Sequence, residues 1–113
     1  MHEFSLVQAL LNRVEVEAEA VNATAVHRLS MRIGQMAGVE RDLFRSAYDL
    51  CREGTICERA ELVIEAVEAS WMCRGCGRTV ESGEALQCSH CGSPARLASG
   101  DVIILEQIEM EVA

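Results

Sequence analysis

Two Cys-x-x-Cys pairs, Cys73 with Cys76 and Cys88 with Cys91, constrain this chain more than any other feature of its sequence. Eleven residues separate the pairs, and a glycine directly follows each second cysteine. Four thiolates brought together in this way suit a tetrahedral metal site, and Zn²⁺ favours closed sites of this kind. The glycines support this interpretation, because the backbone of such a turn passes through a left-handed conformation. The four cysteines therefore predict a structural zinc ribbon.

Two other interpretations of the cysteines are compatible with the spacing. The six cysteines of the chain could form disulfides, but residues 1–20 carry four glutamates and lack the features of a secretory signal. Reduced thiols and a cytoplasmic location are therefore expected. Iron fits the same four sulfurs, and the sequence does not separate it from zinc. Cys51 and Cys57 lack a close partner, and we expect them to be buried or half-buried thiols without a metal.

The composition excludes several classes of function. Half of the 113 residues are hydrophobic, but no apolar run approaches the roughly 20 residues that a membrane span needs. The formal net charge is −8, and four thiolates with one Zn²⁺ change it to about −10. A membrane is not an expected partner, because no such apolar run is present. Nucleic acid is not expected either, because a protein that binds polyanions needs a net basic surface.

Hydrophobic periodicity predicts two helices outside the ribbon. The first helix is expected to start at Ser5 as N-cap, with Gln8 completing a capping box, and to end near Asn22. The second helix is expected over residues 40–52. Its apolar stripe predicts five inward side chains: Leu43, Phe44, Ala47, Leu50 and Cys51.

Three strands are predicted from alternating and β-branched residues, over 26–33, 60–69 and 101–112. The third strand is expected to pair with the second, which places the ribbon between neighbouring strands. In the first strand His27 shares a face with Leu29 and Ile33. We therefore interpret His27 as a core or edge histidine rather than a metal ligand.

These elements predict an α+β fold, with a small mixed three-stranded sheet, two helices and a zinc-ribbon subdomain inserted before the last strand. The expected boundaries are 1–69 with 101–113 for the α/β domain and 70–100 for the ribbon. The ribbon is too small to bury a core of its own, so its order is expected to depend on the metal.

Met1 and His2 form a potential chelate at the amino terminus. The terminal amine, the His2 backbone nitrogen and the His2 imidazole can close two adjacent rings around one ion. Glu3 can add its backbone nitrogen or its carboxylate. Donor sets rich in nitrogen suit Ni²⁺ or Cu²⁺, which displace the amide protons. Chains also begin with Met-His by chance, so a solvated terminus is an alternative interpretation of this motif alone.

The chain as a whole resembles the HypA family of hydrogenase maturation proteins. The similarity extends over essentially the full length, from Met1-His2-Glu3 through the α/β unit to the two Cys-x-x-Cys pairs. It implies a nickel metallochaperone and not an enzyme, with Ni²⁺ bound by the first three residues and structural Zn²⁺ by the four cysteines. It also implies that nickel is inserted into the large subunit of [NiFe]-hydrogenase together with the GTPase HypB. Some relatives also serve urease maturation proteins, and a monomer or homodimer is expected.

Two other functions are compatible with the motifs. A zinc ribbon can serve as a protein- or nucleic-acid-interaction module, although the acidic charge and the absence of lysine count against nucleic acid. A thiol oxidoreductase uses one Cys-x-x-Cys pair at a helix N-terminus with a depressed thiol pKa, whereas two matched pairs are typical of metal ligands. His90 lies inside the second pair and is a candidate alternative ligand or pH-sensitive neighbour, although a cysteine-only site is favoured.

Overall fold

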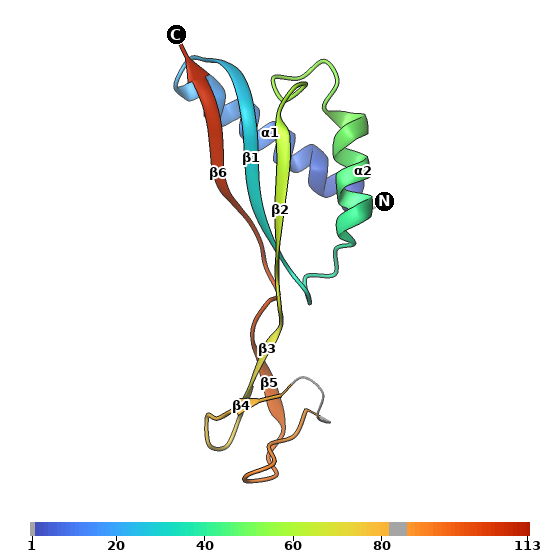
Figure 1. Ribbon diagram of the computed structural model, residues 1–113, viewed down its shortest axis with the longest axis vertical. Coiled ribbons are helices and arrows are strands. Elements are labelled where there is room, and N and C mark those ends of the chain that lie inside the picture. Colours follow the sequence, from blue (N-terminus) through green and yellow to red (C-terminus); the bar gives the residue numbers. More distant parts are fainter. Residues whose placement is uncertain (1, 82–85) are drawn as a thin grey trace. The chain divides into compact units, whose positions relative to one another are not determined.

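The computed structural model describes residues 2–81 and 86–113, and Figure 1 shows its helices and strands. This part of the chain contains two helices and six strands: α1 (His2–Ala20), β1 (Ala23–Gly34), α2 (Arg41–Cys51), β2 (Glu61–Val67), β3 (Ser70–Cys73), β4 (Thr79–Val80), β5 (Ala95–Ser99) and β6 (Ile103–Val112). The strands form two three-stranded sheets, in the orders β2-β1-β6 and β4-β3-β5. The predicted α+β fold, with a ribbon before the last strand, is confirmed. Neither described helix is long and apolar enough to cross a membrane.

Contacts divide the chain into two compact units. The helical unit comprises Met1–Arg32, Val39–Glu65 and Ile104–Ala113, and it contains both helices and most of the β2-β1-β6 sheet. The ribbon unit comprises Ile33–Gly38 and Ala66–Ile103, and it contains the β4-β3-β5 sheet. The end of β1 therefore belongs to the ribbon unit.

Backbone hydrogen bonds explain why the end of β1 groups with the ribbon. The Gly34 amide donates to the Val102 carbonyl at 2.9 Å, and the Gln35 amide donates to the Val67 carbonyl at 2.7 Å. The segments that enter and leave the ribbon are thus both bonded to one short stretch of chain. Gly34 and Gly100 allow this close approach, because a Cβ atom on Gly34 would overlap the Gly100 carbonyl oxygen.

Helix α1 places apolar residues on one face at intervals of three or four positions. Its buried residues are Val7, Leu10, Leu11, Val14 and Ala18. The helix begins at His2, so Ser5 lies within it and the predicted N-cap at Ser5 is wrong. The earlier start places Phe4 on the same face as these buried residues, where it is half-buried. The predicted end is confirmed, since the helix stops at Ala20 and Asn22 adopts a left-handed φ of 55°.

Strand β1 lies between β2 and β6 in the larger sheet (Figure 1). Four ion pairs join it to its neighbours: Arg28–Glu61 (2.9 Å), Arg28–Glu109 (3.1 Å), Arg32–Glu65 (3.5 Å) and Arg32–Glu106 (3.6 Å). From Arg28 to Arg32 the residue number of the glutamate partner rises on β2, from 61 to 65, and falls on β6, from 109 to 106. Strand β2 therefore runs parallel to β1, and β6 runs antiparallel to it. The prediction that the last strand pairs with the second is therefore wrong. Pairing β2 with β6 would set glutamates against glutamates, whereas β1 offers both strands arginines.

His27 lies on the exposed side of β1, so its predicted place on the inner face is wrong. The buried side chains of this strand are Val26, Leu29, Met31 and Ile33. The alternation shifts between Val26 and Leu29, and the shift turns His27 outward. Its side chain is 59% exposed, and Nε2 lies 3.2 Å from the Glu111 carboxylate. His27 is therefore a surface residue in an ion pair.

Helix α2 buries a different stripe from the one that the sequence indicated. Its buried residues are Phe44, Ala47 and Tyr48. The Tyr48 hydroxyl donates to the Ala60 carbonyl at 2.9 Å, which lets this polar aromatic residue occupy the core. The helix is consequently rotated, and Leu43 and Leu50 are 57% and 73% exposed. The predicted inward positions of these two leucines are wrong.

Candidate metal centres

The ribbon unit is a short antiparallel sheet that brings two turns of the chain together. Strand β3 pairs with β4 through Trp71 and Val80, and with β5 through Cys73 and Ala95. The first Cys-x-x-Cys pair starts at the end of β3, and the second pair ends shortly before β5. Pairing of β3 with β5 therefore places the two pairs side by side.

The two Cys-x-x-Cys turns have the same backbone hydrogen bonds. In each turn the first cysteine bonds to the residues four and five positions later: Gly77 N to Cys73 O (3.1 Å), Cys73 N to Arg78 O (2.7 Å), Gly92 N to Cys88 O (2.8 Å) and Cys88 N to Ser93 O (2.9 Å). Gly77 and Gly92 adopt left-handed φ angles of 77° and 76°. The chain therefore builds two equivalent knuckles from local interactions alone.

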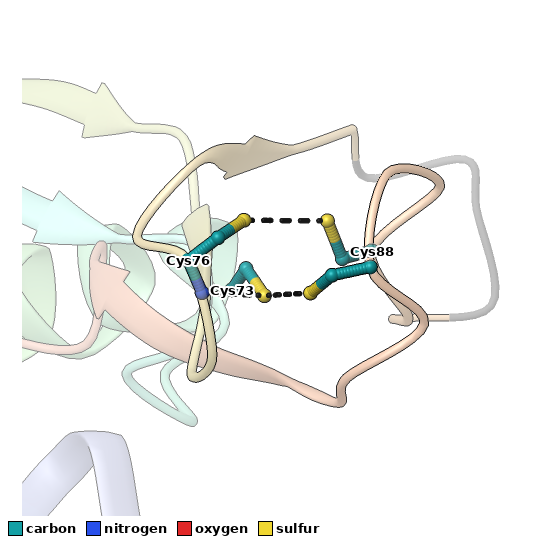
Figure 2. Close-up of side chains that lie close together, drawn as sticks. Cys73, Cys76 and Cys88 are labelled. Atoms are coloured by element: carbon teal, nitrogen blue, oxygen red, sulfur yellow. Dashed lines mark hydrogen bonds between the residues drawn. The ribbon is translucent and has the colours of Figure 1, made fainter.

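The four sulfur atoms meet between the knuckles, and all lie within 4.8 Å of one another. Figure 2 shows the side chains of Cys76 and Cys88 facing each other. Sγ of Cys76 lies 3.8 Å from Sγ of Cys88, and Sγ of Cys73 lies 3.3 Å from Sγ of Cys91. In a regular tetrahedron with Zn–S bonds of about 2.3 Å, the sulfurs lie about 3.8 Å apart. The cluster therefore fits a Zn²⁺ ion whose four ligands all come from the protein.

Backbone amides point at the first ligand. The amides of Gly75 and Cys76 donate to the Cys73 sulfur at 3.2 and 3.4 Å. Donors of this kind stabilise thiolate over thiol and orient the sulfur toward the ion.

The ionisation of the cluster also favours a cation. Hydrogen bonds from the side chain and backbone of Ser93 lower the pKa of Cys91 to about 6. A backbone hydrogen bond from Arg78 lowers the pKa of Cys76, but desolvation and hydrogen bonds shared with the other three thiols raise it to about 11. Four adjacent thiolates repel one another, so the cluster retains protons until a metal ion displaces them.

The ribbon unit has little core apart from its ligands. Its buried cluster, within the described residues, consists of Cys73, Val80 and Cys88, with Trp71 and Ala95 packed against them. Two of these three buried residues are cysteines of the metal cluster. The order of the unit therefore depends on the cage rather than on apolar burial.

The other candidate ligands lie outside this cluster. Across residues 2–81 and 86–113, the four cysteines form the one group of converging metal-binding atoms, and His90 is exposed beside it. Cys51 is half-buried and Cys57 is buried, as predicted. Burial raises the pKa of Cys57 to about 11, so this thiol is protonated at neutral pH.

The predicted amino-terminal chelate starts at Met1, which lies outside the described residues. His2 is exposed and is the first residue of α1. The first four amides of a helix have no acceptor within the helix, so α1 does not use the backbone nitrogens of His2 and Glu3. The Glu3 carboxylate accepts a hydrogen bond from the Glu40 amide at 3.1 Å, and this bond lowers the pKa of Glu3.

Two residues beside these sites were not identified from the sequence. Glu40 contacts Glu3, and the available signal was its position directly before the second helix, where acidic side chains cap free amides. Ser93 lies against the Cys91 thiol, and a Cβ atom on Gly75 would come within 2.6 Å of its hydroxyl. The signal for Ser93 was its place immediately after the second knuckle.

Known proteins resemble this chain over nearly all of its length. The sequence profile described as "Hydrogenase/urease nickel incorporation, metallochaperone, hypA" matches residues 1–110. Hydrogenase maturation factor HypA of Aquifex aeolicus is 39% identical over 99% of both chains, and that of Shewanella halifaxensis is 36% identical over 100% of both.

Two solved structures share the fold. One is the solution structure of the Ni metallochaperone HypA from Helicobacter pylori, with a TM-score of 0.73, 25% identity and 98% of each chain covered. The other is a solution structure of a HypA protein, with a TM-score of 0.75 and 29% identity over 97% of this chain and 96% of that one. The resemblance drawn from the amino-terminal motif and the cysteine pairs is thus confirmed. The chain belongs to the HypA family of non-enzymatic metallochaperones for hydrogenase and urease nickel incorporation.

Proposed function

We propose that this protein holds Ni²⁺ at its amino terminus and delivers it to [NiFe]-hydrogenase during maturation. The proposed ligands are the Met1 amine, the backbone and imidazole nitrogens of His2, and Glu3. One observation carries the assignment: α1 begins at His2, which leaves the His2 and Glu3 backbone nitrogens without an acceptor in the helix. The His2 side chain is also exposed, so the ion can reach the site and leave it.

For Glu3 the backbone nitrogen is the favoured donor. Its carboxylate already accepts a hydrogen bond from the Glu40 amide, and this contact holds the side chain against the start of α2. A nitrogen-rich donor set, drawn from the terminal amine, backbone amides and an imidazole, suits Ni²⁺. The amides must lose their protons to bind, so nickel affinity falls as pH falls.

The proposed zinc ligands are Cys73, Cys76, Cys88 and Cys91. The converging sulfurs and the small apolar core of the ribbon support a structural role, in which the ion neutralises the thiolates and links the two knuckles. The four cysteines occupy every position of a tetrahedral site, so no position is left for a substrate. We assign residues 70–100 to a zinc domain, and 1–69 with 101–113 to a nickel domain.

The proposed partners are the GTPase HypB and the hydrogenase large subunit, with urease maturation proteins as further partners where urease is present. The relatives named hydrogenase maturation factors support this choice. We propose the cytoplasm as the location, because all six cysteines are free and a reducing compartment keeps them so. The net charge of −8 gives no support to the alternative of a nucleic-acid-binding zinc ribbon.

Calorimetric titration with Ni²⁺ tests the nickel assignment. The native protein is compared with the same chain carrying an acetyl group on the Met1 amine. Acetylation converts the amine into an amide without removing a side chain or supplying a new amine, so nickel binding should be lost while one Zn²⁺ per chain is retained. Undiminished nickel binding by the acetylated protein would place the site elsewhere.

A further inference from the structure

Leu43 and Leu50 of α2 form an exposed apolar ridge in the helical unit. The two leucines are seven residues apart, which puts them on one side of the helix with about 10 Å between them. They are 57% and 73% exposed, although the helix already buries Phe44 and Tyr48 in the core. The fold therefore gains little from leucine at these two positions.

The ridge borders a groove between α1 and α2. Figure 1 shows the start of α1 beside α2, and a hollow of about 200 Å³ lies there, lined by Glu3, Phe4, Leu43, Ser46, Ala47 and Leu50. Phe4 is half-buried and supplies an apolar wall on the α1 side. Contiguous apolar surface of this kind, unlike single exposed leucines, is typical of an interaction site.

Acidic side chains border the groove on both sides. Asp42 and Asp49 each precede a leucine of the ridge by one position, so both lie on one flank of α2. Both are exposed. Glu3, on α1, lines the opposite side.

The arginines of α2 point away from the groove. Arg41, Arg45 and Arg52 each stand two positions from a leucine of the ridge, about 200° around the helix. Arg45 donates to the Leu62 carbonyl at 2.8 Å, and Arg52 donates to the Ala60 carbonyl at 3.0 Å. These bonds hold Arg45 and Arg52 toward β2, although Nε of Arg52 also lies 3.8 Å from the Asp49 carboxylate. Asp42, Asp49 and Glu3 outnumber this one cation, so the groove keeps an acidic border.

We propose that this groove binds a basic amphipathic helix of a partner protein. Apolar side chains two turns apart on the incoming helix pack between Phe4 and the leucine ridge, and its flanking lysines or arginines pair with the acidic borders. The inference rests on the proposed function in one respect: Glu3 belongs both to the groove and to the proposed nickel site, so the bound helix brings its protein next to the ion.

A synthetic peptide of about 18 residues, with leucines on one helical face and arginines beside them, serves as the probe. NMR titration of the ¹⁵N-labelled full-length protein should show the largest shift changes at Leu43, Ser46, Leu50 and Glu3. Replacing both leucines (Leu43→Ser with Leu50→Ser) should weaken binding about tenfold or more. The matched control is Val16→Ser, a 65% exposed position on α1, which should leave the affinity unchanged.

The charge argument is tested separately. A peptide with the same leucines but glutamates beside them should not bind. Raising the salt concentration from about 50 to 300 mM should lower the affinity of the basic peptide. Equal binding of both peptides, full affinity in the double-leucine variant, or shift changes elsewhere would overturn the proposal. Concentration-dependent dimerisation through the same face, without peptide binding, would also overturn it by identifying a second copy as the occupant.

The nickel assignment is followed in parallel. The double-leucine variant should bind Ni²⁺ and Zn²⁺ like the native protein but should fail to restore hydrogenase maturation in cells that lack the native gene. Restoration at the native level would contradict the docking proposal alone. If the native protein itself failed to bind Ni²⁺ at its terminus while the peptide still bound in the groove, the proposed function would fail and the docking surface would stand.

Discussion

The Glu3 carboxylate lies 3.1 Å from the Glu40 amide, and this hydrogen bond joins the first turn of α1 to the residue that precedes α2. Glu40 in turn accepts a hydrogen bond from the Asp42 amide at 3.0 Å. Two acidic side chains thus accept hydrogen bonds from the Glu40 and Asp42 amides at the start of α2, where a helix favours negative charge. The end of the chain that carries the proposed nickel ligands is therefore anchored from its third residue onward.

The Glu3 contact predicts a pH-dependent stability difference. Hydrogen bonding from Glu40 lowers the pKa of Glu3 below its ordinary value of 4.5 in the folded protein. The contribution of the ionised carboxylate to the stability of the fold is thus fully present above about pH 4.5, and it is lost as pH falls through the pKa of Glu3 in the folded protein. The difference in melting temperature between the native protein and Glu3→Gln should therefore shrink in acid. Glu17→Gln, at an exposed position of α1, is the control, and a difference that stayed constant down to about pH 2 would refute the contact.

Cys76→Ser should release the zinc ion and disorder the ribbon unit, because the cage supplies most of the order there. Zinc content should fall from one ion per chain to near zero, while the far-ultraviolet signal of α1 and α2 largely remains. Cys51→Ser, which removes a half-buried thiol outside the cluster, should keep its zinc. The assignment fails if Cys76→Ser retains stoichiometric zinc and native ribbon resonances.

Replacing His2 and replacing His27 should have different effects on nickel binding. His2→Ala removes the proposed imidazole ligand and should abolish nickel binding. His27→Ala removes an exposed side chain with one ion pair to Glu111, so it should keep full nickel affinity and change stability by only about 0.5 kcal/mol. Calorimetry and thermal unfolding of both variants check these expectations. Loss of nickel binding in His27→Ala would show that the site extends to β1.

Gly34→Ala should destabilise the protein more than Gly38→Ala. A Cβ atom at Gly34 overlaps the Gly100 carbonyl, and backbone crowding of this kind costs about 1–3 kcal/mol. Gly38 has open space around it but a φ of 75°, so alanine there costs only the conformational strain of about 1 kcal/mol. Urea denaturation of the two variants measures which of them is less stable. Equal stabilities would argue against the close approach of Gly34 to Gly100.

Much of the metal chemistry follows from the sequence because it is local. Each knuckle closes through hydrogen bonds that span four or five residues, and its glycine supplies the left-handed conformation that the turn needs. Spacing along the chain is therefore enough to predict both knuckles and the four-sulfur cluster. The two helices were predicted for a similar reason, since an apolar period of three to four residues needs no knowledge of the partner.

Tertiary structure decided the features that depend on which elements meet. The sheet order placed β1 in the middle because its arginines face the glutamates of both neighbours, a pairing between residues more than 30 positions apart. The outward position of His27 depends on which side of β1 packs on the core, and the exposure of Leu50 depends on how α2 is rotated about its axis. In α2 the buried hydrogen bond from the Tyr48 hydroxyl to the Ala60 carbonyl fixes this rotation. Hydrophobic periodicity indicates that a helix or strand has an apolar face. The elements that pack against it determine which of several similar faces is buried.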